Sequence, residues 1–185
     1  MYSIKGSRLI TEPISVAHDG TISFTFVDKS VPYANRLSQS NLPSYRITTK
    51  PMRLSLHLPG PWLTYYGKIN SFSSTGPIEV HAQVSYWQSQ CPSFMRSGGS
   101  PQISGDFRIS SHDSRLVVEP LCPSPMSLRI KCPGFMAIYS DTLEPDHNVW
   151  VEGQILRRVS NVLYLHTPII APCAHIKDKQ WNSRL

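Results

Sequence analysis

Apolar and polar residues alternate along several short stretches of the chain, and this two-residue period is the pattern of half-buried β-strands. The first such stretch follows Asp19 and Gly20, a dipeptide typical of tight turns, and its apolar residues alternate from 22 to 26. Residues 8–28 are therefore predicted to form a hairpin. The same alternation over 52–58 predicts a half-exposed strand whose polar side is basic.

Two further strands are predicted on either side of a turn. The segment YYGKINSFSSTG, residues 65–76, has the pattern of a strand that runs into a turn, and Gly67 interrupts it as a bulge or a close approach of backbones would. The next strand is predicted to place one set of residues on one face, namely Val80, Ala82, Val84 and Tyr86, and the other set on the opposite face, namely Glu79, His81, Gln83 and Ser85.

The C-terminal part of the chain has a mixed pattern. Apolar residues between 155 and 163 have helical spacing, but several residues from 149 to 162 are β-branched and the segment RRVSN suits a turn. We expect two strands here. Residues 89–105 are rich in Ser, Gly and Pro and are predicted to form an exposed loop.

Phe94 and Met95 form an apolar pair within that polar loop. An exposed apolar pair of this kind either inserts into a partner or a membrane edge, or packs back onto its own domain. The functional prediction is that Phe94 and Met95 insert into a partner or a membrane.

These patterns predict a mainly β fold with roughly eight to ten short strands and little helix. An antiparallel sheet, in a sandwich-like or barrel-like single domain, fits them best. We expect this domain to cover residues 1–176, with 177–185 as a polar C-terminal tail. No internal repeat is apparent in the sequence.

Composition supports this fold class and narrows the compartment. The 185 residues include 16 prolines and only 16% charged residues, which favours short strands and ordered loops over long helices. No apolar run reaches roughly 18 residues, and no signal peptide or lipidation motif is present, so the cytosol or nucleus is expected. The four cysteines are expected to stay reduced, and they are Cys91, Cys122, Cys132 and Cys173. Their spacing is too wide for a zinc knuckle, and the alternative is a metal site that distant histidines complete. No cofactor and no metal is expected.

The formal net charge of +6 comes from one segment. Residues 29–78 contain no acid, and their basic residues are Lys29, Arg36, Arg46, Lys50, Arg53 and Lys68. Such a segment either forms a solvated face without a partner, or a positive patch that attracts phosphates or anionic lipid headgroups. The residues predicted to contact an anion are Arg46, Lys50, Arg53 and Lys68.

Catalytic chemistry is not indicated, and the chain is expected not to be an enzyme. The nucleophile, metalloprotease, P-loop and dinucleotide motifs are missing. The adjacent pairs His18-Asp19 and His112-Asp113 lie in predicted turns, where Asp serves local hydrogen bonds. Signatures of RNA-recognition motifs, zinc fingers and helix-turn-helix domains are also missing, so any nucleic-acid contact would run through the backbone.

The segment YYGKINSFSS, with Lys68, Ile69, Phe72 and the pair Ser73-Ser74, resembles a segment in the matrix proteins of rhabdoviruses. The resemblance implies a non-enzymatic viral structural protein with a sheet-rich domain. It implies partners of four kinds: other copies of the chain, viral nucleoprotein and RNA, an anionic membrane surface, and a viral glycoprotein tail. The implied location is the virion beneath the envelope, and the host cytoplasm, nucleus and membranes.

Two other functions fit the same patterns. A capsid-like jelly-roll coat subunit also needs many strands and assembly surfaces. A nucleic-acid-binding accessory protein, such as a silencing suppressor, would use the basic segment to sequester nucleic acid.

Overall fold

The computed structural model of the chain describes residues 2–31, 34–50, 62–72, 75–88, 100–112, 116–121, 129–132 and 143–173. In these residues one sheet of eleven strands accounts for nearly all regular structure, and the mainly β fold is confirmed. Its strands are β1 (Ser3–Leu9), β2 (Ser15–Val16), β3 (Ile22–Val27), β4 (Ser44–Thr49), β5 (Trp62–Phe72), β6 (Ile78–Gln88), β7 (Gln102–His112), β8 (Leu116–Pro120), β9 (Arg129–Cys132), β10 (Asn148–Val159) and β11 (Val162–Pro172). Two short 3-10 helices, η1 (Ala34–Arg36) and η2 (Gln39–Asn41), lie between β3 and β4.

Several predicted hairpins are present. Strand β2 pairs with β3 around the turn at Gly20, whose φ of 82° suits glycine. In the C-terminal part, β10 and β11 pair from Val149 opposite Pro172 to Val159 opposite Val162, so the two-strand prediction is confirmed over the helical alternative. The strand predicted at 52–58 lies outside the described residues.

The N-terminal half of the sheet, β1 to β6, has a defined pairing order. Strand β1 pairs with β5, β5 with β6, β6 with β4, and β4 with β3. The pairing of β4 with β6 is parallel, whereas the others are antiparallel. The sheet is therefore mixed, and in this half it is antiparallel apart from this one pairing.

The C-terminal half, β7 to β11, repeats that order. Strand β7 pairs with β10, β10 with β11, β11 with β9, and β9 with β8, and again one pairing, β9 with β11, is parallel. We number β1, β3, β4, β5 and β6 as strands 1 to 5 of the first half, and β7 to β11 as strands 1 to 5 of the second. The order of neighbouring strands is then 1-4-5-3-2 in both halves. This is the strand order of the OB fold, a five-stranded and often partly open barrel. The fold thus contains a structural repeat that the sequence analysis missed.

A short sequence trace accompanies the repeat. Strand β4 begins with Ser44-Tyr45-Arg46-Ile47, and the corresponding stretch leading into β9 is Ser-Leu-Arg-Ile, residues 127–130. The two parallel pairings place Ile47 opposite Val80 and Ile130 opposite Leu163, so these segments occupy matching positions in their halves.

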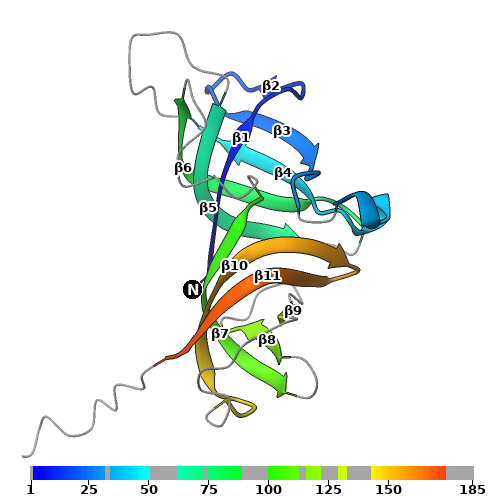
Figure 1. Ribbon diagram of the computed structural model, residues 1–185. Helices are drawn as coiled ribbons and strands as arrows, with labels where there is room; N and C mark the ends of the chain where they lie inside the picture. Colours follow the sequence, from blue (N-terminus) through cyan, green and yellow to red (C-terminus); the bar gives the residue numbers. More distant parts are fainter. Residues whose placement is uncertain are drawn as a thin grey trace, which may run out of the picture.

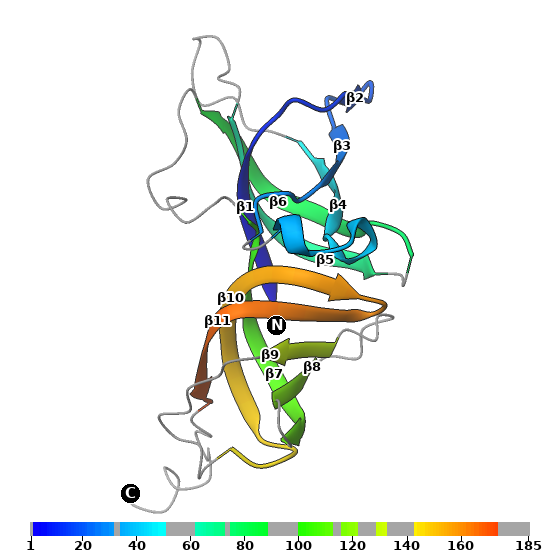
Figure 2. The same cartoon turned by 45° about the vertical axis from the view of Figure 1, so that its right-hand side comes forward.

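The two halves meet along β1 and β7, where Ser3–Lys5 pair with Gln102–Ser104. Figures 1 and 2 show β3 to β6 on one side of this junction and β8 to β11 on the other, with β1 and β7 between them. Buried apolar side chains of both halves belong to one core cluster. Because the core and the sheet are shared, the halves form one continuous structure.

Arg158, which is 5% exposed, fixes the two halves at a second place. Its Nη1 donates to the carbonyl of Gly76, in the turn between β5 and β6, and its Nε donates to the carbonyl of Ser160 at 3.0 Å. Its guanidinium carbon lies 4.8 Å from the ring centroid of Phe72. Burial lowers the pKa of Arg158 from its ordinary value. A buried arginine from β10 therefore caps the end of the β5–β6 hairpin.

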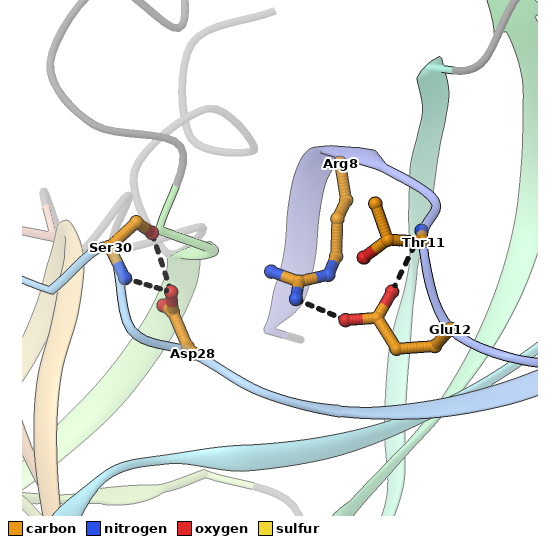
Figure 3. Close-up of polar contacts among 5 residues, drawn as sticks. All are labelled: Arg8, Thr11, Glu12, Asp28 and Ser30. Atoms are coloured by element: carbon orange, nitrogen blue, oxygen red, sulfur yellow. Dashed lines mark hydrogen bonds and ion pairs between the residues drawn. The ribbon is translucent and has the colours of Figure 1, made fainter.

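Side chains bridge the space between β1 and β3 in the N-terminal half. The guanidinium of Arg8 lies 3.9 Å from the ring centroid of Phe26 and forms an ion pair with Glu12. Burial acts to raise the pKa of Glu12, but the hydrogen bond and charge of Arg8 outweigh it and hold the pKa below its usual value. Figure 3 shows this pair beside Asp28, which accepts hydrogen bonds from the backbone and hydroxyl of Ser30.

The predicted loop 89–105 is wrong at its C-terminal end, where residues 102–105 belong to β7. Ser100 is buried and β7 begins at Gln102, because Ile103 is drawn into the core. Residues 89–99 and the predicted tail 177–185 lie outside the described residues.

Candidate nucleic-acid interface

The outer face of β3, β4, β6 and β5 carries three basic residues, Arg46, Lys50 and Lys68, and we call it the basic face. Alternation in β4 buries Tyr45, Ile47 and Thr49 and leaves Arg46 and Lys50 exposed. The basic face is therefore a direct consequence of the two-residue period seen in the sequence.

Two cross-strand rows run across this face. One row consists of directly opposed residues, from β3 through β4 and β6 to β5: Ser23, Thr48, His81 and Lys68. The neighbouring row consists of Thr25, Arg46, Glu79 and Ser71. His81 is exposed, and Lys68 is half-buried with no ion pair to a described residue.

Arg46 is partly engaged by its neighbours. Its Nη1 lies 3.1 Å from Oε1 of Glu79, and its Nε lies 3.4 Å from the hydroxyl of Thr25. The acid-free segment ends at residue 78, and the first acid beyond it folds back onto Arg46 through the parallel pairing of β4 with β6. An exposed pair of this kind contributes only about 0–1 kcal/mol, so Arg46 can exchange Glu79 for another anion at low cost.

Lys50 lies at the end of β4 beside the β2–β3 turn. Thr21 donates its backbone N–H at 3.0 Å and its hydroxyl at 2.8 Å to Asp19, and these bonds together with the charge of Lys50 hold the pKa of Asp19 below its usual value. The sequence assigned Asp19 to local turn hydrogen bonds and not to catalysis, and the local bonds are confirmed.

A bulge in β6 brings Tyr86 to the side of the sheet on which Tyr66 of β5 already lies. The register shifts between Tyr66 opposite Val84 and Gly67 opposite Ala82, which leaves Gln83 as the extra residue. From that point Ser85 is buried, while Val84 lies on the outer face with Tyr66. The predicted facing of Val84 and Ser85 is therefore wrong, because one extra residue reverses every later side chain.

Tyr86 follows Val84 on the same outer side, and its hydroxyl is hydrogen-bonded to that of Tyr66. Burial, followed by the hydrogen bond to Tyr66, raises the pKa of Tyr86. Tyr66 itself is 37% exposed. A tyrosine pair thus borders the basic face at its β5–β6 side.

Of the residues predicted to contact anions, the structure brings Arg46, Lys50 and Lys68 onto the basic face. Arg53 lies outside the described residues, as do Phe94 and Met95, so their roles stay predictions. The other basic residues of the acid-free segment, Lys29 and Arg36, are exposed between β3 and β4 and lie outside the strands of this face. His81, Tyr66 and Tyr86 were not predicted to take part. His81 has an outward position in the sequence pattern. The outward position of Tyr86 follows only from the bulge in β6.

No group of three or more His, Cys, Asp or Glu side chains able to hold a metal ion occurs in the described part of the chain. Nor does any helix within those ranges have the length and hydropathy to cross a membrane.

Comparisons with known proteins leave the family open. No family model matches the chain, and no curated protein sequence matches it. Among solved structures, it is similar to a deletion mutant of the single-stranded DNA binding protein from Thermus aquaticus, with a TM-score of 0.44 and 9% sequence identity over 93% of each chain. A likeness at this level carries no functional argument. The resemblance to rhabdovirus matrix proteins stays a prediction.

Proposed function

We propose that this chain binds single-stranded nucleic acid through the basic face. The observation that carries the proposal is that Arg46, Lys50 and Lys68, on two different strands, share one surface bordered by the Tyr66–Tyr86 pair. Proteins that bind single strands without sequence preference combine a positive groove along the backbone with aromatic side chains on which bases stack.

The place of this surface in the fold supports the same proposal. Strands β3 and β4 are the second and third strands of the OB order, and the outer face of those strands is where OB folds bind oligonucleotides and oligosaccharides. A fold does not assign a function, and the cations and tyrosines of the face are what distinguish nucleic acid from a neutral sugar.

The basic face would bind in a sequence-tolerant way. Lysine and arginine contact phosphates, which every nucleotide carries, and a tyrosine ring can stack on any base. Three cationic contacts on a single strand predict that log K falls with log salt with a slope of about −2. Dissociation constants of about 1–100 µM near physiological salt are expected for such contacts.

Charge reversal on the basic face tests the proposal. Lys50→Glu combined with Lys68→Glu is expected to weaken binding to a fluorescent oligothymidylate at least about tenfold and to reduce the salt slope by about 1.4, because two phosphate contacts are lost. Fluorescence anisotropy at several salt concentrations measures both quantities. The matched control is Lys29→Glu with Arg36→Glu, which changes net charge equally outside the basic face. Equal weakening by both pairs of substitutions would show a general charge effect and refute the site.

The tyrosine pair gives a second, independent arm. Tyr66→Ala is expected to cost about 1–3 kcal/mol of binding free energy through lost stacking, with the salt slope unchanged. An altered slope with intact affinity would contradict a stacking role.

The matrix-type function predicted from the sequence would use the same cations. Phosphatidylserine-containing vesicles provide the comparison, because lipid headgroups offer anions but no bases to stack on. Vesicle binding that needs Lys50 and Lys68 but not Tyr66, with no oligonucleotide binding, would favour the matrix-type function over the one proposed here.

A further inference from the structure

The outer surface that carries the tyrosine pair continues from β5 onto β1. Alternation in β1 buries Ile4 and Gly6 and turns Lys5 outward, where it is directly opposite Tyr66 of β5. Directly opposed residues of an antiparallel pair lie on the same face of the sheet, with Cβ atoms roughly 4.5–5.5 Å apart. A lysine therefore stands beside the tyrosine that borders the basic face.

The open part of this surface leads from Lys5 toward β7. Ser7, an outward residue of β1 beyond Lys5, is 3% exposed, and its hydroxyl accepts a hydrogen bond at 2.9 Å from that of Thr64. In the other direction Ser3 is exposed and pairs with β7. Figure 1 marks this start of the chain with N, where the two halves meet. The accessible path from Tyr66 therefore crosses Lys5 toward the junction.

A carboxylate from the C-terminal half holds Lys5 in this place. Nζ of Lys5 lies 3.3 Å from Oε1 of Glu152 on β10, and the two side chains are 35% and 37% exposed. An ion pair with this exposure contributes little to stability and weakens as salt rises. The ammonium of Lys5 can thus exchange a carboxylate for a phosphate oxygen, as Arg46 can exchange Glu79.

Acids mark the far end of this surface, on the C-terminal half. Asp106 is directly opposite Trp150, and Glu152 follows two residues later on the same face of β10. Arg108, two residues beyond Asp106 in β7, is opposite Glu119 of β8. Carboxylates repel phosphates, so we do not expect a base to stack on Trp150, although this side chain is 40% exposed.

We propose that Lys5 is a fourth cationic contact of the nucleic-acid surface, that it carries the single strand from Tyr66 to the junction of β1 with β7, and that Glu152 competes with phosphate for its ammonium. This inference rests on the proposed function and deepens it, because it says where the strand leaves the basic face. Each phosphate contact on a single strand adds about 0.7 to the steepness of log K against log salt, so four cations predict a slope of about −2.8.

Replacing Lys5 and replacing Glu152 are expected to change affinity in opposite directions. Lys5→Gln is expected to weaken binding to an oligothymidylate of about 16 nucleotides by about threefold to tenfold and to reduce the salt slope by about 0.7. Glu152→Gln is expected to strengthen the same binding by about twofold to fivefold at low salt, because no carboxylate then holds the ammonium. Most of this gain is expected to vanish when Lys5→Gln is also present. Fluorescence anisotropy of the full chain at several salt concentrations measures these effects.

Matched variants separate a local contact from a general charge effect. Lys5→Arg keeps the charge and is expected to keep the salt slope. Lys29→Gln and Glu144→Gln make the same charge changes at exposed residues away from this surface, and each is expected to change affinity less than its counterpart. Trp150→Ala is expected to leave affinity unchanged, and weaker binding would overturn the end of the path at the junction. Circular dichroism melting identifies a variant that fails to fold; if Lys5→Gln does, the direction of the Glu152→Gln effect decides.

The two proposals fail in distinguishable ways. Unchanged affinity and salt slope in the Lys5→Gln protein would overturn the contact at Lys5 and leave the basic face intact. Weaker binding in the Glu152→Gln protein would do the same, because it would mean that the ion pair acts only by joining the halves. No binding to the unaltered protein overturns both proposals.

Discussion

Replacing Gly67 with alanine is expected to lower the free energy of unfolding by about 3 kcal/mol, the upper end of the cost of overpacking. A Cβ at this position would lie 2.2 Å from the carbonyl oxygen of His81 and 2.6 Å from Cα of Ala82. Both atoms belong to the backbone of β6, so no side-chain rotation can relieve the contact. The strand would have to move away from β5 at the bulge.

Urea denaturation of the two proteins measures this loss, and Gly20→Ala is the matched control. Gly20 has a φ of 82°, but its nearest neighbour beyond the adjoining residues is Cε of Lys50 at 3.9 Å. Alanine there meets only backbone strain, about 1–2 kcal/mol. If Gly67→Ala costs no more than Gly20→Ala, then β5 and β6 do not approach this closely and the bulge register is wrong.

Replacing Arg158 with alanine is expected to cost about 3 kcal/mol of unfolding free energy. The change removes two hydrogen bonds from a charged group, each worth about 1.5–3 kcal/mol, although loss of the desolvated charge offsets part of this. It also leaves the Gly76 carbonyl without this donor and removes the guanidinium from the Phe72 ring. The end of the β5–β6 hairpin loses its attachment to β10.

The preceding residue provides the control. Arg157→Ala removes the same side chain from the next position of β10, where it covers Tyr164 on the outer surface and does not contact the N-terminal half in the described structure. A cost of about 0.5–1 kcal/mol is expected, the size of an exposed cation–π contact. Thermal and urea unfolding of both variants decides the matter, because equal costs would mean that Arg158 does not join the halves.

Local patterns in the sequence were enough to place most strands. Alternation located β3, β5 and β6, the Asp19-Gly20 dipeptide located a turn, and Gly67 was correctly assigned to a bulge or close approach. These features depend on neighbouring residues, whose side-chain period is visible in a single sequence. The choice of strands for residues 148–172 was correct for the same reason, since β-branched residues outweighed the helical spacing.

The local patterns did not predict the pairing between strands that are distant in the sequence. Nothing local distinguishes the parallel pairing of β4 with β6 from an antiparallel one, so the repeat of two five-stranded halves was missed. The facing of Ser85 and Tyr86 failed because a bulge adds one residue without changing the sequence pattern before it. Glu79 lies one residue past the acid-free segment, and its contact with Arg46 depends on the same parallel pairing.

The sequence predicted only the part of the candidate site that depends on neighbouring residues. A charge count along the chain identified the segment that carries Arg46, Lys50 and Lys68, because all three lie within fifty residues. Their common face comes from alternation in β4 and from the order of β4, β6 and β5. The outward position of Tyr86 depends wholly on the register after the β6 bulge, and a single sequence does not contain that register.

The junction of β1 with β7 also bears on the order of folding. The hydroxyls of Ser3 and Ser104 lie 3.2 Å apart but are separated by 101 residues, whereas hairpins such as β5–β6 and β10–β11 join neighbouring segments. Closing a long flexible loop costs conformational entropy that grows with its length, and prior formation of each hairpin shortens the effective loop. During synthesis on the ribosome, the pathway with the smallest entropy cost of loop closure is therefore one in which each half folds first and β1 pairs with β7 last.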